Sequence, residues 1–320
     1  MDIQPLDRTN FTFPDQTALY NGKVRDVYAI GDDLMVMVAT DRISAFDVIL
    51  PKTIPFKGQV LNQMAAKFLE NSADIVPNWL MAVPDPNVSI GLRAEPIKIE
   101  FVIRGCLVGH AWREYKEGKR TISGVVMPEG MKEYDSFPEP IITPSTKAEY
   151  GHDLDIDAKE IITSRLLSPG EWDQIQDYIR ALFEHGQNSA LERGLVLADT
   201  KYEFGRLGGR IILIDEIHTP DSSRYFYSDS YEDYISGKTQ VRPKQLSKEF
   251  VREWLMEHGF SGQSGETLPE ITDEFVKMVS ERYIELYEKM TAEKFKKADS
   301  KNARKRIEKA INDYLEANRK

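Results

Sequence analysis

The chain has 320 residues, enough for about two domains at roughly 150 residues each. Its 42 Lys and Arg against 52 Asp and Glu give a net charge of −10, so it lacks the basic footprint of a nucleic-acid-binding protein. No apolar run approaches the roughly 18–20 residues that span a bilayer, no signal peptide is expected, and one cysteine, Cys106, cannot form an internal disulfide or a thiolate metal site. Secreted, membrane and zinc-finger classes are thereby excluded, and a cytoplasmic enzyme is expected.

The first hundred residues favour strands with one helix. Apolar runs at 24–30 and 34–39 flank a turn signal and predict a β-hairpin. At 58–70 the apolar residues recur every three to four positions, which predicts a helix. Prolines in 71–100 favour loops and short edge segments, and strand character returns at 97–103.

The middle of the chain begins with a segment rich in Pro and Gly. Residues 113–147 carry four prolines and three glycines, which predicts a loop-rich excursion rather than a continuous element. Ser168-Pro169-Gly170-Glu171 then predicts a helix start, with a Ser cap, Pro at the first position and Glu three residues after the cap. From Ser247 onward the pattern is helical, with helix caps expected at Ser247 and Thr272. The order of elements predicts an α+β fold.

An acidic hairpin is the most informative stretch for function. Alternate residues of a strand share a face, so Asp199, Lys201 and Glu203 are expected to project together. The return strand ends in Asp215 and Glu216, and carboxylates on neighbouring strands suit Mg²⁺. A solvated hairpin edge is the alternative.

The pairing of the two strands decides whether these carboxylates meet. A two-residue turn at Gly208-Gly209 would put Asp215 on the face away from Glu203. An odd-length loop or a glycine bulge would place the two residues opposite each other. We predict the odd register.

A basic strand near the N-terminus is the second candidate. Lys23 and Arg25 share one strand face beside Gly22, which lets a ligand approach the backbone closely. Two cations beside a glycine suit a polyphosphate, and an exposed basic strand edge is the alternative. The P-loop and Rossmann fingerprints are missing from the sequence.

Three further polar segments could bind anions or simply stabilise turns. Asp41–Asp47 brings two acids and a hydroxyl directly after a strand, where a turn cap is the alternative. Arg104 could clamp a carboxylate or phosphate, or pair structurally. Residues 219–224 combine hydroxyls, backbone donors and an arginine, as an anion site or a capped turn would. Together the five segments point to phosphoryl transfer.

Four of these motifs resemble one enzyme family, SAICAR synthetase (phosphoribosylaminoimidazole-succinocarboxamide synthase). The resemblance extends, with the motifs in the same order, from about residue 18 to the C-terminal helices. The chain is similar to the longer form of the family, with extra sequence at 113–147. The matching segments are Gly22-Lys23-Val24-Arg25-Asp26-Val27-Tyr28, Ala39-Thr40-Asp41-Arg42-Ile43-Ser44-Ala45-Phe46-Asp47, Ala198-Asp199-Thr200-Lys201-Tyr202-Glu203-Phe204-Gly205, and Asp215-Glu216 with Thr219-Pro220-Asp221-Ser222-Ser223-Arg224.

The resemblance implies an ATP-dependent ligase of de novo purine biosynthesis. It would join L-aspartate to the carboxylate of carboxyaminoimidazole ribonucleotide (CAIR) through an acyl phosphate, with ATP and Mg²⁺. The implied fold has an antiparallel-sheet N-terminal lobe and a larger α+β lobe with C-terminal helices, around a cleft like that of kinases and ATP-grasp enzymes. We expect boundaries at 1–100, 101–246 and 247–320.

By motif match the resemblance also implies residue roles. It gives Asp199 and Lys23 catalytic roles, with Asp199 positioning or deprotonating the aspartate amine, and it places Glu203 and Asp215 on the metal. The implied ATP contacts are Gly22, Lys23, Arg25, Arg93 and Lys98, with 93–98 lining the adenine pocket. The implied substrate contacts are Arg104, Ser145, Lys147, Asp153, Ser222, Ser223 and Arg224.

Two positions depart from the family pattern. Cys106 stands where a tyrosine is usual, and His110 stands where a serine that contacts the nucleotide phosphate is usual. His110 could donate an imidazole hydrogen bond instead, or the contact could be lost. The alternative functions are a kinase-like small-molecule phosphotransferase and a non-catalytic nucleotide-binding regulator.

Overall fold

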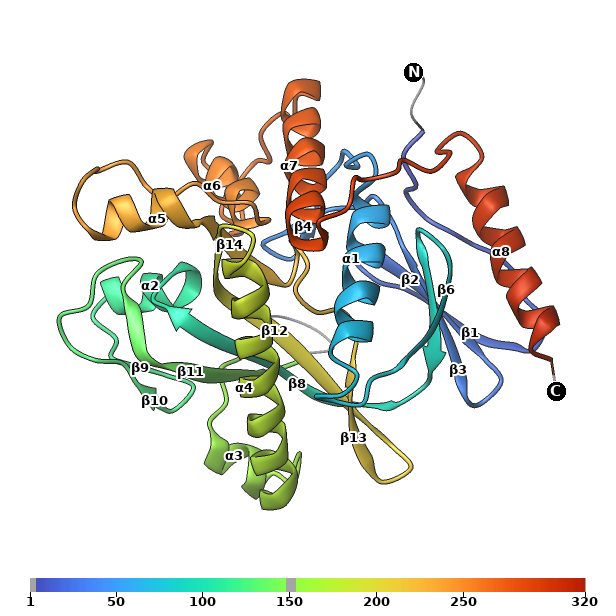
Figure 1. Cartoon of the computed structure of the whole chain (residues 1–320), viewed down its shortest axis with the longest axis horizontal. Coiled ribbons are helices and arrows are strands. Elements are labelled where there is room, and N and C mark those ends of the chain that lie inside the picture. Colours follow the sequence, from blue (N-terminus) through green and yellow to red (C-terminus); the bar gives the residue numbers. More distant parts are fainter. Residues whose placement is uncertain (1–3, 148–153, 320) are drawn as a thin grey trace.

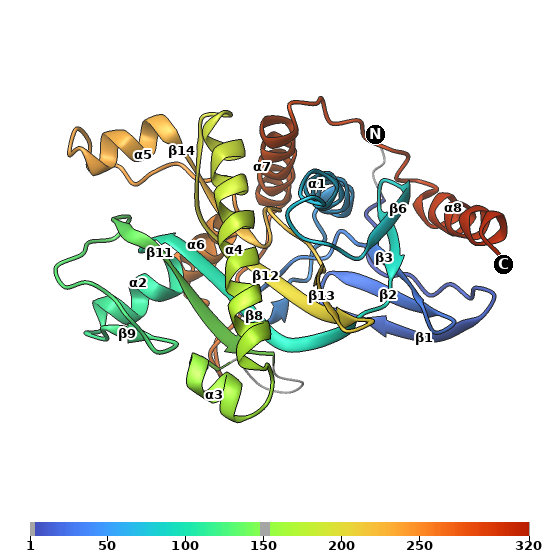
Figure 2. The same ribbon diagram turned by 60° about the horizontal axis from the view of Figure 1, so that its bottom comes forward.

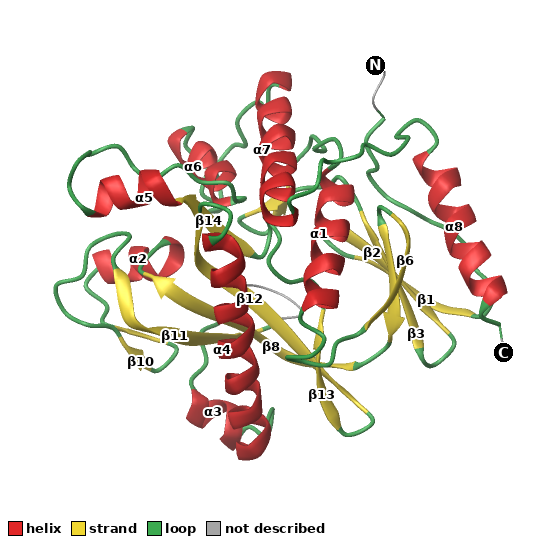
Figure 3. Cartoon of the chain, viewed as in Figure 1, coloured by secondary structure: helices red, strands yellow, loops and turns green. Residues whose placement is uncertain are grey.

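The computed structural model describes residues 4–147 and 154–319. Two antiparallel five-stranded sheets lie next to each other, with helices between and around them (Figure 1). Figure 3 shows that the fold contains both helices and strands, and its two larger sheets are antiparallel, so the α+β fold class is confirmed.

The N-terminal sheet contains the first hairpin predicted from the sequence. It consists, in spatial order, of β1 (Gln16–Asn21), β2 (Arg25–Ile30), β3 (Leu34–Ala39), β7 (Val88–Leu92) and β6 (Leu80–Asp85).

Both faces of the N-terminal sheet are covered. Helix α1 (Lys57–Asn71) lies on one face, where its buried side chains share a core with Met37 of β3. Helix α8 (Ala303–Ala317) covers the other face, packing Ile307 and Ile311 against Tyr28 and its neighbours. The view turned by 60° shows α1 and α8 on opposite sides of this sheet (Figure 2).

The central sheet positions the candidate site. Its members are β11 (Ser136–Thr146), β8 (Glu95–Cys106), β12 (Leu195–Leu207) and β13 (Arg210–Ile214) in spatial order, with β14 (Ser223–Tyr227) also paired to β12.

Strand alternation divides the central sheet into a core face and a site face. Phe101 on β8 and Tyr202 and Phe204 on β12 are buried in the same core as Phe183 of α4 (Pro169–Leu191). The intervening residues of both strands point the other way. We call that side the site face; it carries Glu100, Val102, Arg104, Asp199, Lys201 and Glu203.

The remaining elements flank these two sheets. They are the strand pairs β4 (Ser44–Ala45) with β5 (Val48–Ile49) and β9 (Thr121–Ile122) with β10 (Val125–Val126), and the helices α2 (Gly109–Lys116), α3 (Ala158–Thr163), α5 (Ser228–Ile235), α6 (Glu249–Glu257) and α7 (Asp273–Thr291).

The prediction of a loop-rich excursion over 113–147 is wrong for its second half. Residues 136–146 form β11, which pairs antiparallel with β8. Prolines cannot donate to a ladder, and they are tolerated here because β11 is an edge strand with a register irregularity between Ser136 and Ile141.

Two of the three predicted helix caps are confirmed. Ser168 accepts from the Glu171 amide in a capping box, and Thr272 accepts from the Phe275 amide. Ser247 is not a cap, because α6 begins two residues later and the Ser247 hydroxyl donates to Gln245 instead.

The division at residues 100 and 246 stays a prediction. Strand β8 passes through residue 100, so the central sheet begins at residue 95. Among residues 4–147 and 154–319, no helix combines the length and the apolar character needed to cross a membrane.

Candidate active site

Three charged side chains form a row across the site face. Asp199 on β12 lies opposite Arg104 on β8 and opposite Arg224 on β14. Its buried carboxylate accepts from Arg104 Nη1 at 3.3 Å and from Arg224 Nη1. Burial, together with the charge of Arg224, lowers the pKa of Arg104 to about 10 although Asp199 opposes the shift. An anionic ligand would relieve this excess of positive charge.

The row borders a cavity of about 330 Å³, which we call the central cavity. The predicted residues Arg104, Asp199, Ser222, Ser223 and Arg224 therefore meet in one place. Its lining also includes Phe46, Asp47, Glu100, Val102, His110, Arg113, Thr200, Lys201, Pro220, Asp221, Lys248, Glu249 and Arg252.

Hydroxyl groups line one wall of the central cavity. The hydroxyls of Ser223 and Thr200 are 2.7 Å apart, and Ser222 accepts from the Thr219 amide at 3.1 Å. Residues 219–224 thus combine a tight turn with the first residues of β14, which sets their hydroxyls beside Arg224. Hydroxyls next to guanidinium groups are a suitable environment for a phosphate or carboxylate.

A second cluster continues along β12. Glu203 is buried and accepts from Lys201 Nζ at 2.5 Å and from Lys147 Nζ. Burial opposes ionisation of Glu203, but the two lysines outweigh it and hold its pKa below the usual range. Asp199, Lys201 and Glu203 share one face, as predicted from strand alternation.

The predicted odd register of the hairpin is wrong. Glu203 pairs with Ile214 and Leu207 with Arg210, so Gly208 and Gly209 form a two-residue turn. The carboxylates nevertheless approach each other because β13 ends at Ile214 and Asp215 takes a left-handed φ of 62°. This backbone turn interrupts the alternation on which the register argument depends.

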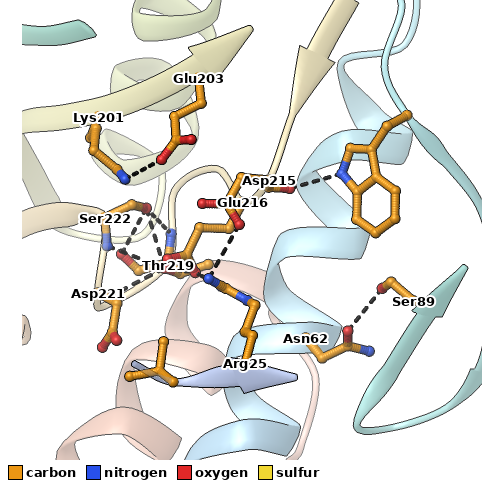
Figure 4. Close-up of polar contacts among 12 residues, drawn as sticks. Arg25, Asn62, Ser89, Lys201, Glu203, Asp215, Glu216, Thr219, Asp221 and Ser222 are labelled. Carbon is orange, nitrogen blue, oxygen red and sulfur yellow. Dashed lines mark hydrogen bonds and ion pairs between the residues drawn. The ribbon is translucent and has the colours of Figure 1, made fainter. Parts of the chain in front are cut away.

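Asp215 and Glu216 meet the basic strand β2. Arg25 Nη1 lies 3.2 Å from Asp215 Oδ1, and Arg25 Nη2 contacts Glu216. Figure 4 shows Lys201, Glu203, Asp215 and Glu216 around one space, with Arg25 entering from β2. Burial raises the pKa of Asp215 to about 6, with Arg25 opposing the shift and Glu203 and Glu216 adding to it.

Glu203 and Asp215 fit one side of a Mg²⁺ site. Across the described ranges 4–147 and 154–319, no cluster of three or more His, Cys, Asp or Glu is placed to hold a metal by itself. Mg²⁺ ordinarily takes one or two carboxylates and fills its other positions with water and phosphate oxygens. Burial is the main cause of the raised pKa of Asp215, and repulsion from Glu203 and Glu216 adds to it; a divalent cation would relieve both effects.

The side chain of Arg42 stabilises the turn between β1 and β2. Its guanidinium donates to the Gly22 carbonyl at 2.9 Å and to Asp26 at 2.8 Å, and its Nε donates to the Lys23 carbonyl at 3.1 Å. Lys23 itself is exposed and lies 2.5 Å from Asp47, which lines the central cavity. Gly22 and Lys23 thus lie between the N-terminal sheet and the cavity.

The other predicted contacts are more scattered. Arg93 is exposed in the connection between β7 and β8, and Lys98 is exposed on β8, where its carbonyl accepts from the Lys147 amide. Ser145 on β11 pairs with Glu100 at the cavity edge. Asp153 lies outside the described residues.

The sequence analysis predicted the helix that became α6 but did not identify the charged residues at its start as part of the site. Glu249 is buried and accepts from Arg224 at 2.9 Å and from Arg252 at 2.8 Å, with Arg113 3.5 Å away. Residues 248, 249 and 252 fall on one helical face, opposite the apolar 250, 251, 254 and 255, and this charged stripe was the signal available.

Comparisons with known proteins agree with this site. Residues 18–268 match the family model described as SAICAR synthetase. The chain belongs to the SAICAR synthetase family. A phosphoribosylaminoimidazole-succinocarboxamide synthase from Azobacteroides pseudotrichonymphae is 58% identical over 97% of this chain and 95% of its own length, and one from Flavobacterium psychrophilum is 58% identical over 98% and 99%.

A solved structure shows the same fold. The SAICAR synthase from Saccharomyces cerevisiae complexed with SAICAR superposes with a TM-score of 0.74 at 31% identity, covering 88% of this chain and 96% of that one. As a member of the SAICAR synthetase family, the chain is an ATP-dependent ligase that acts on aspartate in purine biosynthesis. The sequence resemblance is confirmed, and neither alternative function is favoured.

Proposed function

We propose that the site face is where this SAICAR synthetase joins L-aspartate to the carboxylate of CAIR through an acyl phosphate. The observation that supports the proposal is the row Arg104–Asp199–Arg224, which borders the central cavity and continues through Lys201 to Glu203. Anion-binding groups and metal-type carboxylates are thereby placed side by side.

The cations of the site would bind the two anionic substrates. Arg104 and Arg224, with Ser222 and Ser223, would hold CAIR by its phosphate or carboxylate, since guanidinium groups bind both in a bidentate manner. Lys23 and Arg25 would contact the ATP phosphates. Phosphoryl transfer depends mostly on such positioning and on neutralising charge.

Glu203 and Asp215 would hold Mg²⁺. When bound, the ion would neutralise charge that develops on the transferred phosphoryl group. Lys147 and Lys201 bind Glu203, and Arg25 binds Asp215, so these cations balance the charge of both carboxylates in the free protein.

Asp199 would orient the amine of the substrate L-aspartate, or accept its proton, while that amine attacks the activated carbonyl. A carboxylate is a poor acyl donor, and its conversion to an acyl phosphate supplies a good leaving group. Asp199 also fixes the geometry of Arg104 and Arg224, because its carboxylate accepts from both guanidinium groups.

A coupled ADP-release assay, with each co-substrate omitted in turn, tests the proposal. We expect ADP and succinocarboxamide product when ATP, Mg²⁺, CAIR and aspartate are all present. Steady release of ADP with CAIR alone would indicate a phosphotransferase, and nucleotide binding without ADP from the full mixture would indicate a regulator. A cytoplasmic location stays a prediction, which fractionation of cells that express a tagged chain would test.

A further inference from the structure

The turn that carries Asp215 and Glu216 contains two strained residues. Asp215 has a φ of 62° and His218 a φ of 56°, and neither is a glycine. The left-handed region is unfavourable for such residues, which keep it where their surroundings hold them there. Without this conformation the strand register would direct Asp215 away from Glu203.

Trp79 anchors the start of the turn. Its buried indole Nε1 donates to the Asp215 carbonyl at 2.9 Å. The backbone around it is tied to β13, since the Trp79 amide donates to the Leu213 carbonyl at 3.1 Å and the Leu213 amide donates to the Pro77 carbonyl at 2.9 Å. The indole therefore reaches Asp215 from a segment that is itself fixed to the preceding strand.

His218 anchors the end of the turn. Its imidazole is fully buried, with Nε2 hydrogen-bonded to the Tyr202 hydroxyl at 2.7 Å and the ring edge-on to Phe68. Tyr202 lies between Lys201 and Glu203 on β12, so the anchor is attached to the strand that carries the other carboxylate.

Gly186 on α4 makes room for this imidazole. A Cβ at Gly186 would lie 2.5 Å from His218 Cε1, far inside van der Waals contact. Helix α4 otherwise packs on the core face of the central sheet, away from the cavity.

We propose that Trp79 and His218 are positioning residues that hold the turn 215–218 in its left-handed form and so keep Asp215 on the same side as Glu203. Neither residue would touch the nucleotide or the metal. The inference rests on the proposed function in one respect, the assignment of Asp215 as a ligand of nucleotide-bound Mg²⁺.

Calorimetric titration with ADP, in the presence of Mg²⁺ and in the presence of EDTA, tests the inference. The variants are Trp79→Phe, which keeps an aromatic ring but removes the donor, and Gly186→Ala, which displaces the imidazole. We expect both to weaken binding of Mg²⁺·ADP by about tenfold, as for other groups that orient metal ligands. Binding of ADP in EDTA should stay as in the natural chain.

Matched controls separate this effect from simple loss of packing. Trp172→Phe removes an indole that packs against Phe101, and Gly170→Ala adds a methyl on the same helix as Gly186 with nothing within 4 Å. Both controls should bind Mg²⁺·ADP normally. If Gly186→Ala does not fold, Trp79→Phe decides the question.

Asp215→Asn distinguishes failure of the inference from failure of the proposed function. Weak Mg²⁺·ADP binding by Asp215→Asn with normal binding by Trp79→Phe would overturn the positioning role and leave the metal assignment intact. Normal binding by Asp215→Asn would overturn the metal assignment and the inference with it. Equal weakening of Trp79→Phe with and without Mg²⁺ would also overturn the inference, because it would show a general structural defect.

Discussion

Two buried carboxylates of the protein pair with the arginines of the central cavity. Asp199 accepts from Arg104 and Arg224, and Glu249 accepts from Arg224 and Arg252. A buried charge without a partner is costly, so these carboxylates keep the arginines stable and oriented before an anionic substrate arrives. At the scale of single residues, these carboxylates therefore balance charge and orient the arginines that we propose to bind substrate.

Asp199→Asn keeps the size of the side chain and removes its charge. If Asp199 orients or deprotonates the attacking amine, turnover should fall by about 100-fold or more, while the KM for ATP changes little. Steady-state kinetics with saturating CAIR and aspartate would measure both. Asp177→Asn, at an exposed position of α4, is the control, and unchanged turnover of Asp199→Asn would remove the proposed role.

His110 should make binding of the phosphate-bearing substrate depend on pH. Burial and the charge of Arg104 lower the pKa of His110 in the free protein, with Asp155 and Glu114 opposing and Arg113 adding to the shift. A phosphate beside the ring would raise this pKa again, so binding takes up a proton. The contribution of His110 to affinity is then absent at alkaline pH and grows as pH falls through the pKa that the imidazole has in the complex.

His110→Ser tests this dependence, because a hydroxyl does not titrate in this range. The ratio of the KM for CAIR in His110→Ser to that in the natural chain should increase by up to about tenfold between pH 8 and pH 6, the effect of ~1.4 kcal/mol from a charge-assisted hydrogen bond. Protonation of the CAIR phosphate changes the KM of both proteins to the same extent, so it does not affect the ratio. A ratio that is constant with pH would show that His110 makes no such contact.

At the scale of elements, local patterns were predictable and non-local pairing was not. The alternation of Asp199, Lys201 and Glu203 and the cap at Ser168 depend on a few neighbouring residues, and both are confirmed. The register of β12 with β13 depends on the length of the loop between them, and the sequence is compatible with both an even and an odd number of loop residues. The left-handed conformation of Asp215 has no local signal in the sequence. The prolines of β11 suggested a loop because a sequence does not show which strand lies at an edge.

The capping box of α4 should contribute to stability and not to catalysis. Ser168→Ala removes the acceptor for the Glu171 amide and should lower the free energy of unfolding by about 1 kcal/mol. Urea denaturation would measure this change, and turnover should stay the same because α4 covers the core face of the central sheet. Ser189→Ala, inside the same helix, should cost less, and an equal loss in both variants would contradict a specific capping effect.

At the scale of the whole molecule, α1 connects the N-terminal sheet to the site. Figures 1 and 2 both show α1 beside α7, between the two sheets. The Gly58 amide at its start donates to Asp41 at 2.9 Å, directly after β3. The preceding residue, Lys57, is fully buried and donates to Asp221 in the cavity wall at 2.9 Å. One end of a helix thus connects the segment after β3 to the turn 219–224 in the cavity wall.

The Lys57–Asp221 pair should therefore be strongly coupled. Burial opposes ionisation of Asp221, but Lys248, Lys57 and the Tyr283 hydroxyl outweigh it and hold its pKa below the usual range. Lys57→Met removes one of the positive charges that compensate the buried Asp221 carboxylate. The substitution should lower the free energy of unfolding by about 3–5 kcal/mol. Adding Asp221→Asn should recover part of that loss, because the double variant no longer buries an unbalanced charge.

A double-mutant cycle followed by urea denaturation measures this coupling. The exposed i,i+4 pair Lys309–Asp313 on α8 provides a matched cycle, which should show a coupling below about 0.5 kcal/mol. If the two cycles give equal coupling energies, Lys57 is not the connection between the sheets. A large coupling at Lys57 would show that this buried pair helps to hold the start of α1 against the turn 219–224, which lines the central cavity.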